Sequence, residues 1–217
     1  MLKRWFGWCS AWIVTLLLSA NVLADTFDAT QPYDMILKVS DQAFSRLSAE
    51  QEMIKADPDH LKVVVEEELM PYVNYRYAAL KLLGPNLKGA KRDDVMEFIT
   101  AFRAYLVTSY AQVLTQYTGQ EVKFGPEPKI DDKTSIIGVK VTIMDSPRPN
   151  INLEFKLRKD KKSGEWKAFD MIAEGISLLS SKQSEWNTKI RQEGILSVAS
   201  ELEKLAKAPI RFEGGGQ

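Results

Sequence analysis

The chain has 217 residues, a length that suits one domain or two small ones. Its 29 Lys and Arg residues balance its 29 Asp and Glu residues, so bulk charge gives no reason to expect nucleic-acid binding. One cysteine excludes an intramolecular disulfide, and one histidine excludes any metal site that needs two histidine ligands. An apolar fraction of 45% is ordinary for a globular protein and excludes disorder as the main state.

The first 24 residues have the three-part layout of a secretory signal peptide. Lys3 and Arg4 precede an uncharged stretch that ends in the cleavage-like tripeptide 22–24. The alternative is a retained membrane anchor, because about 20 uncharged residues can just span a bilayer. Asn21 and the tripeptide favour removal. Cleavage would take away the cysteine and two basic residues, so that 27 basic residues would face 29 acidic ones, a formal charge of −2.

The first half of the exported chain is predicted to be helical. Apolar residues recur every three or four positions over 32–56, 57–69 and 91–118, which is the spacing of one face of a helix. Pro71 lacks a backbone N–H, so the second helix is expected to kink or break there. Three helices therefore precede any strand.

The pattern then changes to the alternation of β-strands. Residues 137–143 and 151–157 alternate apolar and polar side chains, a third strand covers 166–172, and a weaker one covers 122–124. Short connections between these strands imply an antiparallel meander. Helices before and after a sheet make an α+β fold, and the helices should lie on one face because the other face of strand 151–157 is polar.

The chain returns to helix near its end. Ser180 and Gln183 have the spacing of a capping box, which predicts a helix start at Ser180. No repeat or internal linker divides the chain. The predicted organisation is a signal peptide over 1–24, a single domain over 25–210 and a flexible tail over 211–217.

The sequence offers little for catalysis. It contains no Gly-x-Ser-x-Gly, phosphate-loop or dinucleotide motif, and its single histidine, His60, fits a solvated position at a helix start. Asp170 is the exception, because a carboxylate among apolar strand residues can have a raised pKa and act as a general base. Pairing with a nearby basic or backbone group is the better interpretation, since no catalytic partner accompanies it. We therefore expect no catalytic residue, metal site or cofactor.

Three stretches of the chain resemble the MlaC family of periplasmic phospholipid carriers, also called the toluene-tolerance family. They are Glu-Glu-Leu-Met-Pro-Tyr-Val at 67–73, the aromatic stretch at 98–110, and Trp-Lys-Ala-Phe-Asp-Met-Ile-Ala-Glu-Gly-Ile-Ser at 166–177, followed by Lys-Gln-x-Glu-Trp at 182–186. The third is the most specific. Their order and spacing fit across essentially the whole exported chain.

The resemblance implies a fold and a function. The fold would be of the NTF2-like type, a curved antiparallel sheet packed against several helices that enclose an apolar cavity. The protein would be a soluble periplasmic carrier that moves glycerophospholipids between the outer and inner membranes and maintains outer-membrane lipid asymmetry. Its partners would be an outer-membrane lipoprotein–porin complex and an inner-membrane ABC transporter with an MCE-domain subunit. Bound phospholipid would be cargo, not a cofactor.

The residues agree with a carrier of apolar cargo. At about 0.8 kcal/mol per CH₂, two acyl chains carry on the order of 20 kcal/mol of exposure cost in water, so a carrier needs a large apolar lining. Tyr72 and Tyr75 suit the mouth of such a cavity, because each ring is apolar and has a polar tip. Each lining candidate could instead be ordinary core. These candidates are Phe98, Phe102, Leu106, Tyr110, Val139, Val141, Ile143, Leu153, Phe155 and Met171.

Two other functions remain open on the sequence. One is a small-molecule enzyme of NTF2-like fold that uses Asp170 as its general base. The other is a periplasmic chaperone or scaffold that binds partners on its surface, for which the polar sheet face with Lys140, Lys156 and Arg158 is a candidate. An ordinary solvated face explains these three residues better.

Overall fold

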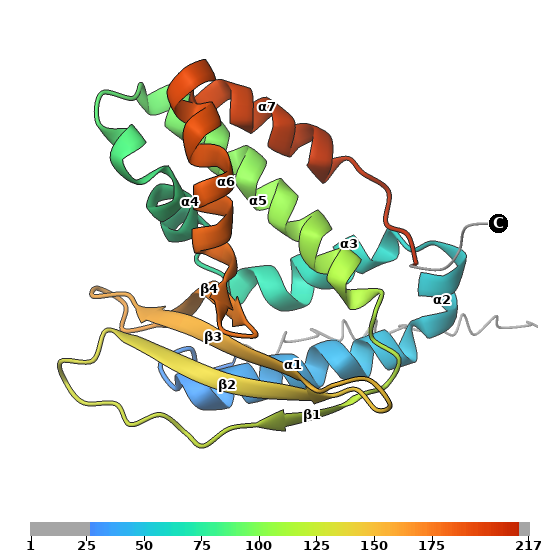
Figure 1. Ribbon diagram of the computed structural model, residues 1–217. Helices are drawn as coiled ribbons and strands as arrows, with labels where there is room; N and C mark the ends of the chain where they lie inside the picture. The colour runs from blue at the N-terminus through green and yellow to red at the C-terminus, as the bar shows by residue number, and fades with distance from the viewer. Residues whose placement is uncertain (1–26, 213–217) are drawn as a thin grey trace, which may run out of the picture.

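The computed structural model describes residues 27–212, so the predicted signal peptide lies outside the described residues. This part of the chain confirms the α+β class (Figure 1). The α-helices are α1 (Pro32–Ala49), α2 (Gln51–Ala56), α3 (His60–Val64), α4 (Tyr75–Leu83), α5 (Arg92–Leu114), α6 (Leu178–Glu193) and α7 (Ile195–Ala206). The strands are β1 (Glu121–Phe124), β2 (Ile136–Met144), β3 (Ile151–Lys159), β4 (Trp166–Ala173) and β5 (Ile176–Ser177).

The five strands form one curved antiparallel sheet in the order β1-β2-β3-β4-β5. The predicted meander is therefore confirmed. Because paired residues share a face, the register gathers the apolar side chains of β2 and β3 on one face and leaves Lys140, Lys156 and Arg158 on the other. A β-bulge between Lys156 and Leu157 adds Phe169 to β4 at this point.

Helix α1 covers one half of the apolar sheet face. Met35, Ile36 and Val39 follow the predicted helical spacing and pack against Leu157 and Trp166, which are almost completely buried. The prediction that helices lie on the apolar face is confirmed for α1. The predicted helix 32–56 is interrupted between Ala49 and Gln51, so that its last turn forms the separate helix α2.

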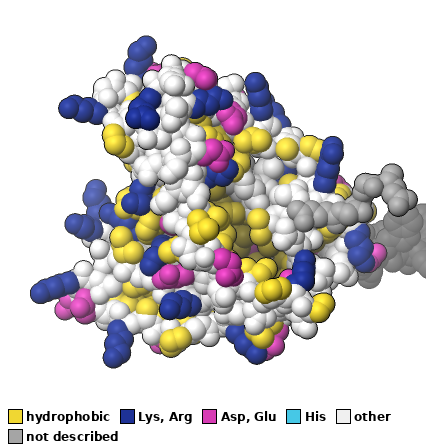
Figure 2. Space-filling model, viewed as in Figure 1, with side chains coloured by type: hydrophobic (Ala, Val, Ile, Leu, Met, Phe, Trp, Pro, Cys, Tyr) yellow, Lys and Arg dark blue, Asp and Glu magenta, His cyan; other side chains and the backbone are white. Residues whose placement is uncertain are grey.

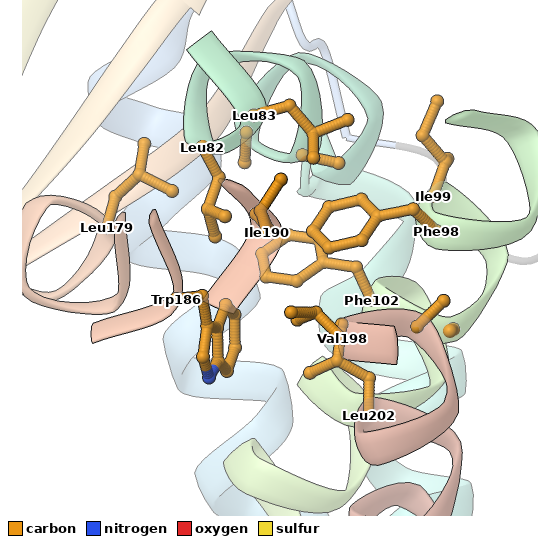
Figure 3. Packing of buried hydrophobic residues seen from close by; sticks show 14 of the residues in the cluster. Leu82, Leu83, Phe98, Ile99, Phe102, Leu179, Trp186, Ile190, Val198 and Leu202 are labelled. Atoms are coloured by element: carbon orange, nitrogen blue, oxygen red, sulfur yellow. The ribbon is translucent and has the colours of Figure 1, made fainter. Parts of the chain in front are cut away.

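The other long helices, α4 to α7, stack against one another beyond the β4 edge of the sheet (Figure 1). Their shared core contains Phe98 and Phe102, whose rings stack at 6.1 Å, together with Trp186 and Leu202 (Figure 3). The fold thus has two parts, a sheet covered by α1 and a layer of helices above the sheet edge.

The segment between α3 and α4 joins these two parts. Helix α3 continues into a π-helical turn, η1 (Val65–Leu69). A 3-10 turn that contains Pro71, η2 (Met70–Tyr72), follows, so the predicted break of the helix at Pro71 is confirmed. Arg46 on α1 forms ion pairs of 2.7 Å with Glu67 and with Glu68 on η1. These contacts fix η1 against α1.

The predicted capping box at Ser180 is wrong. Helix α6 begins at Leu178, and the N-cap is Ser177, whose side chain accepts a hydrogen bond from the Ser180 backbone N–H. Gln183 instead donates from Nε2 to the backbone oxygen of Lys81 on α4, at 3.0 Å. The helix starts earlier than predicted because β5 leads directly into it and Ser177 supplies the cap.

The end of the domain is fixed to the helices. Ile210 is buried and donates its backbone N–H to Asp59, and Arg211 exchanges two backbone hydrogen bonds with the Gln112 side chain. Arg211, which the sequence placed in the tail, is thus bound to α5. Residues 213–217 lie outside the described residues, and their flexibility stays a prediction.

Candidate ligand-binding site

Half of the apolar sheet face has no helix packed on it. The register aligns Val141 with Leu153 and Ile143 with Ile151, and Met171 lies on the same face opposite Phe155. Val141, Ile143, Leu153 and Met171 belong to none of the three packed hydrophobic clusters of the described residues. Three of them are only half-buried. We call these four residues the open apolar face.

A hollow lies between the sheet and the layer of helices, with hydrophobic side chains gathered inside it (Figure 2). Tyr110 of α5 lies close enough to β4 for the Asp170 carboxylate to act on it electrostatically, and the register pairs Asp170 with Lys156, on the face opposite the open apolar face. Burial, with smaller contributions from Asp170 and Tyr105, raises the pKa of Tyr110 to about 12. The Tyr110 hydroxyl is therefore poorly solvated.

The twelve lining and mouth residues predicted from the sequence fall into distinct places. Val141, Ile143, Leu153 and Met171 form the open apolar face. Phe98, Phe102 and Leu106 belong to the helical cluster, and Tyr110 packs against the cluster between α1, α3 and α5. Val139, Phe155 and Tyr72 pack under α1, and Tyr75 lies beneath the Arg103 guanidinium, 5.4 Å from the ring centre. A role of any of them in binding lipid stays a prediction.

A second hollow, which the sequence did not predict, is a groove of about 940 Å³ between α1 and the β1 edge of the sheet. Phe44 and Tyr117 approach to 4.5 Å between ring centres, and both also pack against the cluster that contains Tyr110. The groove contains none of the twelve predicted residues. Its lining is Leu37, Lys38, Ser40, Asp41, Phe44, Ser45, Ser48, Ala49, Tyr117, Gln120, Val122 and Phe124.

The groove could have been found in part from the sequence. Tyr117 belongs to the apolar stripe predicted for 91–118, and Leu37 and Phe44 each stand next to a residue of the predicted α1 face, Ile36 and Ala43. The apolar surface of α1 is thus wider than a single stripe. What the sequence does not show is that the extra width faces a groove and not a neighbouring helix.

The Asp170 carboxylate accepts three hydrogen bonds within the fold. Its Oδ1 accepts the backbone N–H groups of Met171, at 2.8 Å, and Leu179, at 3.0 Å, while its Oδ2 accepts the Ser177 hydroxyl at 2.6 Å. The carboxylate thereby ties β4 to the first turn of α6. The pairing with backbone groups that the sequence favoured over a general base is confirmed.

Within residues 27–212, no helix is both long and apolar enough to cross a bilayer. The same residues contain no group of three or more His, Cys, Asp or Glu side chains placed to hold a metal ion. The described part of the chain is an α+β domain in which hydrophobic side chains gather in a hollow between the sheet and the helices (Figure 2).

This fold and its sequence agree with known proteins. The model of the MlaC protein family matches residues 37–204, and the chain belongs to that family. It is 34% identical over 213 residues to the intermembrane phospholipid transport system binding protein MlaC of Haemophilus influenzae, covering 97% of each chain. It is 24% identical over 164 residues to the toluene tolerance protein Ttg2D of Pseudomonas putida, covering 75% of this chain and 74% of that one.

A solved structure shows the same fold. The phospholipid-binding protein of Ralstonia solanacearum, determined in complex with a phospholipid, superposes with a TM-score of 0.70 at 14% identity, covering 80% of this chain and 96% of that one. At this identity the likeness concerns the fold alone. The curved antiparallel sheet packed against several helices, which the family resemblance implied, is confirmed.

Proposed function

We propose that this protein is a periplasmic carrier that binds glycerophospholipid and moves it between the outer and inner membranes. The observation that supports this most is the open apolar face, because its four neighbouring apolar residues belong to none of the packed hydrophobic clusters of the described residues. Acyl chains in the hollow would supply the missing contacts, at about 0.8 kcal/mol for each CH₂ removed from water. The names of the Haemophilus and Ralstonia proteins support phospholipid as the cargo.

The groove between α1 and β1 is a candidate for part of the same cargo. Its volume of about 940 Å³ is at the upper end of the usual range for small-molecule sites. Phe44 and Tyr117 line the groove and also pack against the same cluster as Tyr110, so cargo in the groove would lie close to that cluster. Lys38 and Asp41 at its rim suit a polar head group near solvent.

A carrier of this kind needs partners that deliver and accept the lipid. We propose the pair that the family resemblance implies, an outer-membrane lipoprotein–porin complex and an inner-membrane ABC transporter with an MCE-domain subunit. The protein would thereby maintain outer-membrane asymmetry. No enzymatic step belongs to this function. The competing function, an enzyme with Asp170 as general base, is disfavoured because that carboxylate already accepts three hydrogen bonds.

Native mass spectrometry of the purified protein, combined with solvent extraction, tests the proposal. We expect phospholipid to copurify in a fixed ratio and to exchange with lipid supplied in vesicles. A protein that carries no lipid, even after incubation with vesicles, would contradict the proposal. Partner binding is tested separately, by whether the lipid-loaded protein transfers its cargo to the reconstituted transporter.

A further inference from the structure

The β3–β4 hairpin concentrates positive charge in a chain that has no net charge. Residues 156–167 include six basic and two acidic side chains, whereas the whole chain has 29 of each. Lys161 and Lys162 are exposed in the turn. An uneven distribution of this kind attracts anions to one part of the surface.

A pocket of about 300 Å³ opens at the base of this hairpin, where the segment 73–76 runs beside β4. Arg76, Arg158 and Lys167 contribute to its wall. The register sets Arg158 directly opposite Lys167, so both leave the polar face of the sheet, and like charges in this position destabilise a sheet. The rest of the lining is Val73, Asn74, Tyr75, Asp160, Ser163 and Glu165.

The three cations of the pocket have no ion-pair partner among the described residues. The Arg158 guanidinium lies over the Tyr77 ring, 4.5 Å from its centre, and Arg76 donates to the Met96 sulfur at 3.7 Å. These contacts orient the guanidinium groups without neutralising them. Arg158 is therefore held in place with its charge available.

The two acids of the pocket are occupied by the turn. Asp160 Oδ1 accepts the backbone N–H groups of Ser163, at 3.0 Å, and Lys162, at 2.7 Å. Those two bonds, helped by the charge of Arg158, hold the pKa of the Asp160 carboxyl below its usual range. Glu165 accepts the Ser163 hydroxyl at 3.3 Å. With three cations against two acids, the pocket keeps a net positive charge.

We propose that this pocket binds a phosphate group, either free or on the head group of a lipid at a membrane surface. A guanidinium fork held on an aromatic ring is suited to two parallel hydrogen bonds with a phosphate, and Lys167 adds a second positive charge beside it. The bound anion would relieve the repulsion between Arg158 and Lys167. The site lies on the polar face of the sheet, opposite the open apolar face, and shares only Tyr75 with the residues predicted from the sequence for lipid binding.

Titration with inorganic phosphate at constant ionic strength, followed by the backbone amide NMR signals of Ser163 and Lys167, tests the site directly. We expect saturable shifts in the wild-type protein. Lys167→Gln should weaken binding about fivefold and the Arg158→Gln/Lys167→Gln pair about 25-fold, because each substitution removes one charged donor from the pocket. Within the part of the chain that the structure describes, Lys167 makes no ring contact and no ion pair. Its single variant should therefore fold even if loss of the Arg158–Tyr77 contact destabilises the double variant.

The matched control is Lys204→Gln/Lys207→Gln, which removes the same charge from exposed positions at the end of α7. It should leave phosphate binding unchanged. Equal weakening in the control would overturn the proposal, because it would show attraction by overall charge. An absence of saturable shifts in the wild-type protein would overturn it as well.

Sedimentation with vesicles separates the two sources of phosphate. Wild-type protein that sediments with phosphatidylglycerol vesicles, together with loss of sedimentation in the pocket pair only, would assign the site to a lipid head group. Phosphate shifts without sedimentation would assign it to free phosphate. Extracted phospholipid, measured in the same samples, reports on the carrier function and should be the same in the pocket variants, so failure of one proposal is distinguishable from failure of the other.

Discussion

The carboxylate of Asp170 on β4 accepts a hydrogen bond of 3.0 Å from the backbone N–H of Leu179 in the first turn of α6. The N–H groups of a first turn have no partner within their helix, and a negative charge beside them also interacts favourably with the helix dipole. The same carboxylate accepts the hydroxyl of Ser177, the N-cap residue. Asp170 thus fixes where the layer of helices leaves the sheet.

Replacing Asp170 should therefore affect stability. Asp170→Ala removes the acceptor for Leu179 and Ser177, and we expect a loss of about 2 kcal/mol in the free energy of unfolding. Asp170→Asn keeps one acceptor oxygen and should lose less. Urea unfolding measures both. If the two variants were equally stable, or if neither differed from the wild type, the proposed link between β4 and α6 would be wrong.

Filling the hollow should expel the cargo. Leu153 lies on the open apolar face, and Leu153→Trp adds volume where no packed cluster stands in the way. We expect the extracted phospholipid to fall several-fold while the melting temperature changes little. The measurement is phosphorus per protein after solvent extraction.

Lys140→Trp is the control for this experiment. Lys140 is exposed on the polar face of the neighbouring strand, so the same large side chain there should leave the lipid content unchanged. Loss of lipid in both variants would show that the sheet as a whole had been disturbed. Full lipid content in Leu153→Trp would show that the cargo lies elsewhere, for which the groove beside Phe44 is the first candidate.

Phe102 should behave in the opposite way to Leu153. It is 3% exposed and lies inside the helical cluster beside Phe98, so Phe102→Ala leaves a cavity in packed core. The expected cost is about 3–5 kcal/mol in the free energy of unfolding, measured by urea denaturation. The protein that remains folded should keep its lipid. A variant of unchanged stability that had lost its lipid would identify Phe102 as a lining residue.

The contrast between Phe102 and Leu153 shows what the sequence could predict. Both stand in regular apolar patterns, and those patterns correctly predicted a helix and a strand. Periodicity says which face of an element is apolar, but not whether another element covers that face. Leu153 stays outside the packed clusters and Phe102 lies in the cluster with α6 and α7 because of how distant segments pack. A pattern within one segment contains no information on that packing.

The local sequence was similarly ambiguous about which serine caps helix α6. Ser180 matched a capping box by spacing, yet the hydrogen bonds run from Ser180 to Ser177 and from Gln183 to α4. The competing cap depends on Asp170, which is brought to this helix end by the sheet. Asp170 was also the one catalytic candidate in the sequence. Its tertiary contacts decide between a role as general base and a role in fixing the start of α6.

Acid should remove a part of the stability that depends on Glu50. Burial raises the pKa of the Glu50 carboxyl, but hydrogen bonds from His60 and Arg46 outweigh burial and hold that pKa below its usual 4.5. A lowered pKa in the folded state means that the contribution is fully present above pH 4.5 and is lost as the pH falls through the lowered value. Glu50→Gln should therefore be less stable than wild type at neutral pH, and the difference should shrink at acid pH.

Urea unfolding across this pH range checks the prediction, with Glu52→Gln as the control. Glu52 is 89% exposed and pairs only with Lys55 in the described structure, so its substitution should change stability little at any pH. A Glu50→Gln curve parallel to the wild-type curve would contradict the argument. Glu50 contacts His60 at 2.6 Å and Arg46 at 2.9 Å. Parallel curves would mean that these contacts do not stabilise the charged carboxylate of Glu50 in the folded chain any more than water does in the unfolded chain.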